Sequence, residues 1–271
     1  MRPTALSLFA AASLTIGLGQ TAMAADMPTK GPVYKTPVGV ASSNWQGFYI
    51  GGHVGGAWGD TDFSWPVGDH FGVAGTGASI SDSSVFGGGQ VGYNWQVSPI
   101  WVLGIEGTFS ATDLNATSAT APSLVFPGEF VSVGSKVSDI WTITGRLGWT
   151  GWYNWLLYAK GGYASGRIET TATDFTAAAL PHHGASATSW HGGWTVGTGI
   201  EFKFASNWVF GLEYDFIRLD TATHSGTAFS LDGTAPGAPT LYSQDVKTDI
   251  SAVTARLSYL FNWSGPIVAR Y

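Results

Sequence analysis

Ionisable residues occur within stretches of this sequence in which every second residue is apolar. In WVLGIEGTFS, the residues Trp101, Leu103 and Phe109 lie on one face of a predicted β-strand. Glu106 lies on the other face. The same placement holds for seven residues: Glu106, Arg146, Lys160, Glu201, Glu213, Asp215 and Arg256. Such groups could transfer protons, line an ion path or pair with one another.

Two other motifs could bind small ligands, and in both cases the surrounding sequence argues against it. Residues 87–92 read GGGQVG and match a dinucleotide fingerprint, but strand alternation continues through the glycines and no helix follows. His182 and His183, with His191 nearby, could bind a metal, but the chain has no cysteine and no suggestively spaced acidic residue. We therefore predict solvated loop histidines, no metal site and no cofactor.

Hydrolytic chemistry is the third possibility. His53 shares the inner face of its strand and could approach Ser258 or Glu213. A nucleophile elbow of the G-x-S-x-G type is missing, and a continuous strand would not provide its strand–turn–helix setting. We predict no catalytic residue and no enzymatic activity.

The elements that would position these residues are β-strands. Alternation with a period of two recurs in eight segments of about ten residues, as membrane-crossing strands require: 48–58, 85–96, 101–110, 141–149, 156–165, 194–202, 210–216 and 253–262. Short links at 97–99, 151–154 and 205–207 alternate with long links at 60–82, 111–137, 167–189 and 219–247. The pattern predicts an all-β fold, an eight-stranded antiparallel up-and-down transmembrane β-barrel with both ends in the periplasm.

Tryptophan is distributed as a membrane interface would require. The dipeptide Asn-Trp recurs five times beside short turns or chain ends, and we predict one aromatic belt there: Trp45, Trp95, Trp101, Trp149, Trp155, Trp208 and Trp263. A second belt is predicted at the opposite strand ends: Trp58, Trp141, Trp190 and Trp194. A soluble β-sandwich or lipocalin, the rival fold, gives no reason for this sorting.

The ends of the chain suggest export. Arg2, an apolar run and an Ala-Met-Ala site predict a signal peptide at residues 1–24, with a membrane-anchoring helix as the alternative. Residues 25–43 read as a flexible periplasmic leader, 44–263 as the barrel and 264–271 as a short tail. Only 11% of residues are charged, against about 25% in ordinary domains, which suits a lipid-facing sheet. The net charge of −6 argues against nucleic-acid binding.

The segments NWQGFYIGGHVGGAWG, VFGGGQVGYNWQ, GWTVGTGIEFKFASNWVFGLEYDF and VTARLSYLFNW resemble small outer-membrane β-barrel proteins of alphaproteobacteria. These are the outer-membrane immunogenic or opacity-like proteins, sometimes called porins. The resemblance implies an outer-membrane location, contact with lipid and lipopolysaccharide, and insertion by the outer-membrane assembly machinery. It carries over no catalytic motif.

Within such a barrel the seven ionisable residues would face a lumen only wide enough for side chains. Neighbouring strands carry Glu106 with Arg146, and Lys160 with Glu201, so opposite charges can meet. Inward glycines such as Gly92 and Gly199 leave room for them. We expect an ion-pair network that closes the lumen of a structural envelope protein. The alternatives are a small ion-conducting pore and a loop-mediated adhesin or recognition protein.

The long loops carry more acid than base, and could bind cations or an unknown partner, although a solvated surface is the simpler interpretation. Their acidic residues are Asp60, Asp62, Asp69, Asp113, Glu129, Glu169, Asp174, Asp220, Asp232 and Asp245. Arg167 and Arg218 lie near the predicted outer rim, where they could meet phosphates of lipopolysaccharide.

Overall fold

The computed structural model describes residues 43–236 and 240–261. The predicted signal peptide, the leader up to residue 42, the tail and Trp263 lie outside the described residues. Eight long strands dominate: β1 (Gly47–Ser64), β2 (Gly77–Gln96), β3 (Trp101–Thr117), β5 (Phe130–Trp149), β6 (Trp155–Phe175), β7 (Pro181–Lys203), β8 (Trp208–Thr227) and β10 (Leu241–Phe261). The short strands β4 (Ala121–Pro122) and β9 (Phe229–Ser230) pair with β5 and β7. Over this part of the chain, helices with the length and apolar character of a membrane span are absent.

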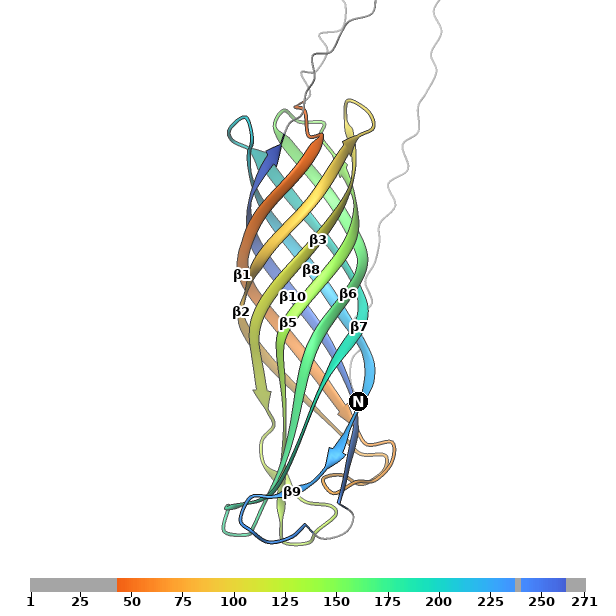
Figure 1. Cartoon of the computed structure of the whole chain (residues 1–271), viewed down its shortest axis with the longest axis vertical. Coiled ribbons are helices and arrows are strands. Elements are labelled where there is room, and N and C mark those ends of the chain that lie inside the picture. The colour runs from red at the N-terminus through yellow and green to blue at the C-terminus, as the bar shows by residue number, and fades with distance from the viewer. Residues whose placement is uncertain (1–42, 237–239, 262–271) are drawn as a thin grey trace, which may run out of the picture. The chain divides into compact units, whose positions relative to one another are not determined.

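The long strands close into an antiparallel barrel (Figure 1). Each strand pairs with its neighbours in the chain, and β1 also pairs with β10 over residues 48–64. In Figure 1 the short turns lie at the upper end of the barrel and the long loops at the lower end. The predicted eight-stranded up-and-down β-barrel is therefore confirmed.

The strands are longer than the sequence pattern predicted. They contain 17–23 residues, so much of what we expected to be loop is paired sheet. The reason lies in the phase of the alternation. Beyond the membrane the outer face becomes polar and the inner face apolar, as in β1, where Asp60 and Asp62 point outward and Phe63 is buried. The period of two persists while the buried face changes from polar to apolar.

The outer surface of the membrane segment is apolar, and the tryptophans lie near its edges. Trp95, Trp101, Trp155 and Trp208 are exposed, as the periplasmic belt requires, and Trp149 is partly exposed. Trp45 is a correction: it is fully buried, and its Nε1 donates to Thr150 Oγ1 at 3.0 Å. It precedes β1 and packs into the short-turn end of the barrel interior instead of facing lipid. Trp58, Trp190 and Trp194 are exposed at the opposite edge.

The barrel interior contains three layers. At the short-turn end an apolar cluster fills the opening: Trp45, Tyr49, Val102, Leu156, Tyr158, Val209 and Leu260. At the long-loop end a larger apolar core includes Ile140, Ile168, Leu219 and Ile250, all fully or almost fully buried. The seven predicted ionisable residues lie between these layers, each with at most 9% of its surface exposed.

Candidate functional site

The ionisable residues of the lumen form one connected cluster. Arg146 on β5 donates two hydrogen bonds to the carboxylate of Glu201 on β7, at 3.0 and 3.2 Å. Its Nη1 is also 3.7 Å from Glu106 Oε2 on β3. A bidentate arginine–carboxylate contact fixes both planes, so these two side chains have little freedom to move.

The other two cations bind the remaining acids. Lys160 Nζ is 2.8 Å from Glu213, 3.1 Å from Asp215 and 3.5 Å from Glu106. Arg256 donates through Nη1 to Glu213 and through Nη2 to Glu106. Glu106 thus contacts all three cations. The expected partnership of Lys160 with Glu201 is replaced by contacts across the lumen, because the barrel is narrow enough for side chains of non-adjacent strands to meet.

Two tyrosines, which the pattern of ionisable residues did not single out, complete the cluster. Tyr49 donates from its hydroxyl to Glu106 at 2.8 Å, and Tyr158 donates to Glu213 at 2.5 Å. The guanidinium of Arg146 lies 4.8 Å from the centre of each ring, within the range of a cation–π contact.

Glycines make room for these two rings. A Cβ atom at Gly92 would lie 2.3 Å from the Tyr49 hydroxyl, and one at Gly199 would lie 2.4 Å from the Tyr158 hydroxyl. The inward glycines therefore do leave space for longer side chains. An inward tyrosine paired across strands with an inward glycine is the signal that could have revealed these contacts.

A second polar group lies next to the charged cluster. His53 contacts Gln90 Oε1 through Nδ1 at 2.7 Å and Ser110 Oγ through Nε2 at 2.8 Å. Gln90 also donates to Ser258 Oγ at 3.1 Å. Both ring nitrogens of His53 are thus engaged, by partners other than Ser258 and Glu213. The partner of His53 Nδ1 is the amide of Gln90, whereas a hydrolytic triad would need a carboxylate at this position.

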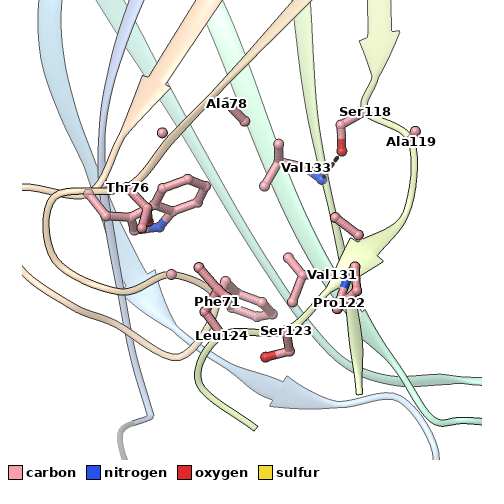
Figure 2. Close-up of a pocket in the computed structure, with 14 residues that line it drawn as sticks. Phe71, Thr76, Ala78, Ser118, Ala119, Pro122, Ser123, Leu124, Val131 and Val133 are labelled. Carbon is pink, nitrogen blue, oxygen red and sulfur yellow. Dashed lines mark hydrogen bonds between the residues drawn. The ribbon is translucent and has the colours of Figure 1, made fainter. Parts of the chain in front are cut away.

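The long-loop end contains an apolar cavity of about 170 Å³ (Figure 2). It lies between the loop that follows β1 and the segment around β4. Its apolar lining includes Trp65, Phe71, Pro122, Leu124, Val131 and Val133. This cavity is large enough for a small apolar group, such as a partner's side chain.

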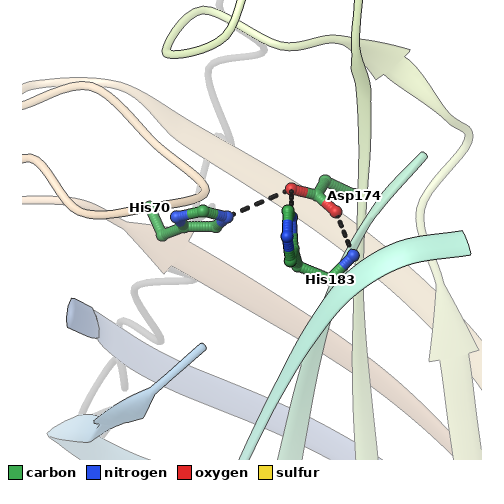
Figure 3. A group of neighbouring side chains, drawn as sticks. All are labelled: His70, Asp174 and His183. Atoms are coloured by element: carbon green, nitrogen blue, oxygen red, sulfur yellow. Dashed lines mark hydrogen bonds and ion pairs between the residues drawn. The ribbon is translucent and has the colours of Figure 1, made fainter. Parts of the chain in front are cut away.

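The histidines of this end differ from the solvated residues we expected. His183 is only 3% exposed and His191 only 1%. His183 and His70 both contact Asp174 (Figure 3). His191 Nε2 is 2.6 Å from His224 Nε2. The expectation of solvation was wrong because the extended strands enclose this region, and sequence alone did not place His70 beside Asp174.

Taken with its lipid-facing surface and aromatic belts, the closed barrel defines an integral membrane protein of the outer-membrane class. Residues 10–261 match the family described as "Outer membrane protein beta-barrel domain". The chain is 31% identical over 212 residues to the 31 kDa outer-membrane immunogenic protein of Brucella melitensis, covering 77% of this chain and 85% of that protein. The same values hold for the protein of that name from Brucella suis.

The protein therefore belongs to the outer-membrane β-barrel family and is located in the outer membrane. The resemblance seen in the sequence is confirmed. Among solved structures, it is similar to Ail, the attachment invasion locus protein of Yersinia pestis, with 14% identity, 79% and 99% of the two chains covered, and a TM-score of 0.35. It is also similar to the outer-membrane protease OmpT of Escherichia coli, with 10% identity, 79% and 97% coverage, and a TM-score of 0.49.

Proposed function

We propose that this protein is a structural component of the outer membrane with a surface role, and that its charged cluster closes the lumen to ions. The observation that carries the proposal is that every strand of the ring contributes a side chain to this cluster. In strand order these are Tyr49, Asn94, Glu106, Arg146, Lys160, Glu201, Glu213 and Arg256. A cross-section filled in this way holds the strands together and leaves little room for water.

Electrostatics supports closure. The three cations of the cluster each contact at least two carboxylates, so a passing ion would have to displace charge-assisted hydrogen bonds. Breaking such a buried pair leaves an uncompensated charge and is strongly unfavourable. Apolar side chains packed on both sides of the charged cluster narrow the lumen further.

The proposal includes contacts with the envelope. Arg167, whose side chain is 52% exposed, and Arg218, whose side chain is 38% exposed, reach the surface near the outer belt and could bind lipopolysaccharide phosphates. Each also lies near an aspartate, Asp139 or Asp249, which limits the attraction. We also propose that the outer-membrane assembly machinery inserts the protein and that the protein is not an enzyme. The hydrogen bonds of His53 to an amide and a hydroxyl are consistent with a non-enzymatic interior.

Efflux from vesicles tests the closed lumen. Liposomes loaded with potassium chloride and a small sugar, and carrying the folded barrel, are expected to leak no faster than protein-free liposomes. Rapid efflux of either solute would refute closure and favour the pore. A separate test of the structural role is deletion of the gene, which we expect to increase sensitivity to detergents; unchanged sensitivity would contradict an envelope function.

Recognition by the loops is the second candidate, and the cavity in Figure 2 favours it. Its lining is apolar, and it faces the long-loop end of the barrel. A partner that inserts a side chain there should lose binding when Leu124, which is 69% exposed, is changed to aspartate. The barrel should still fold. Binding that survives Leu124→Asp would exclude this cavity as the recognition site.

A further inference from the structure

A buried cluster of histidines and carboxylates lies among the long loops, well away from the charged cluster of the lumen. At its centre is Asp174 at the end of β6, which is 1% exposed. His70 comes from the loop between β1 and β2 and is 1% exposed, and His183 comes from the start of β7 and is 3% exposed. These three residues belong to segments separated by up to 113 positions of sequence (183 − 70 = 113).

The two histidine side chains converge on one oxygen atom of Asp174 (Figure 3). His70 Nε2 and His183 Nδ1 each lie 3.1 Å from Asp174 Oδ2. The three potential ligand atoms all lie within 4.8 Å of one another. Two ligands that are each about 2.0–2.1 Å from a tetrahedral zinc ion are roughly 3.3 Å apart. Two of the three edges of this triangle therefore already have nearly the length that zinc requires.

The charge of the surroundings favours a cation. The carboxylates of Glu129 and Asp232 approach His182 at 3.3 and 3.7 Å, beside the Asp174 group. Within the described part of the chain, no lysine or arginine forms an ion pair with Asp174, Glu129 or Asp232. A buried carboxylate without a lysine or arginine partner is costly, and among the described residues only the two imidazoles and a backbone amide hydrogen-bond to Asp174.

We propose that His70, Asp174 and His183 form a zinc site that joins the loop after β1 to the β6–β7 hairpin. Imidazole nitrogen and carboxylate oxygen are established ligands of Zn²⁺, whereas Mg²⁺ prefers oxygen ligands alone. The second possible group, Glu129 with Asp174 and His182, shares Asp174 but is less buried. In this proposal Glu129 and His182 do not bind the ion but surround the site that Asp174 shares with His70 and His183.

Calorimetric titration with Zn²⁺ alone tests the proposal. The folded protein, without an affinity tag and stripped by a chelator, is expected to bind one zinc ion with a dissociation constant of about 1 μM or lower. We expect Asp174→Asn, His70→Gln and His183→Gln each to weaken binding by about 10- to 100-fold. His53→Gln, which alters a histidine in the lumen, is the matched control and should bind as the wild type does.

The outcomes distinguish a zinc site at His70, Asp174 and His183 from a site at Glu129 and His182 and from no zinc site. Absence of binding by the wild type, or unchanged binding by Asp174→Asn, would overturn the proposal. Loss of binding in His182→Gln with full binding in His70→Gln would also overturn it, because the ion would then lie in the outer group. If Asp174→Asn does not fold, His70→Gln decides the question, because His70 lies in a loop. Zinc is also expected to slow proteolysis of the loop after β1 in the wild type and in His53→Gln, and to do so much less in the three ligand variants.

Discussion

At the scale of single residues, we expect Glu106 to contribute strongly to the stability of the barrel. It is fully buried and contacts Arg146, Lys160 and Arg256. Glu106→Gln keeps the shape and removes the charge that compensates the three cations. We expect the free energy of unfolding to fall by about 3–5 kcal/mol, measured by urea titration of the barrel in lipid vesicles.

The matched control for this prediction is an exposed ion pair. Asp113 is 71% exposed at its side chain and lies 3.0 Å from Lys136. Asp113→Asn should change the free energy of unfolding by less than about 1 kcal/mol, because solvent screens this pair. Equal losses of unfolding free energy in the two variants would show that burial does not make the ion pairs of Glu106 more important for stability.

A second residue-scale prediction concerns pH. His224 lies on β8 beyond the outer tryptophan belt, between His191 and Thr170. Burial, and next the neighbouring His191, lower the pKa of His224 to about 4. The unfolded chain, with a pKa of about 6.5, binds more protons between these values. Stability from the neutral imidazole is therefore complete above about pH 6.5 and is lost as the pH falls toward 4.

Amide hydrogen exchange checks this expectation. After correction for intrinsic exchange rates, the opening free energy of residues 222–226 should be lower at pH 5 than at pH 7. In His224→Gln the difference should be greatly reduced. A wild-type protein with the same opening free energy at both pH values would contradict the prediction.

At the scale of elements, close packing between strands β6 and β7 can be tested at a glycine. Gly199→Ala would place a Cβ atom 2.5 Å from Tyr158 Cζ and displace that ring from Glu213. We expect a loss of about 1–3 kcal/mol in the free energy of unfolding, measured by the same urea titration. The control is Gly161→Ala, where the nearest atom would be 3.5 Å away, an ordinary contact. An equal loss in both variants would contradict the packing argument.

The sequence predicted the membrane part of each strand but not its full length. In β10, Val253 and Leu257 point to lipid, whereas Ile250 and Val246 are buried inside. The apolar phase thus reverses between Ile250 and Val253, and a pattern search that requires a constant apolar face ends there. The inward charges were predictable from the alternation. Their partners were not, because contacts across the lumen depend on barrel shear and on the depth of each side chain.

The contacts of the loop histidines could not be predicted from the sequence either. His182 and His183 were visible as possible ligands, but His70 and Asp174 lie far away in sequence. Only the pairing of β6 with β7, which sets Thr173 opposite Gly184, and the path of the first long loop bring them together. Long-range proximity of this kind has no signature in local composition.

At the scale of the whole molecule, the interior is an alternation of apolar, charged and apolar layers within one continuous sheet. The charged layer joins non-adjacent strands, and an apolar layer lies on each side of it. We therefore expect the same packing to stabilise the barrel and to close its lumen.

Conductance in a planar lipid bilayer tests this central claim most directly. The protein is refolded, shown to be folded by its resistance to unfolding, and inserted at low density. We predict a current indistinguishable from that of the lipid alone at every applied voltage. Stable, reproducible single-channel steps would contradict the account, because they would require a continuous water path past Glu106 and its partners.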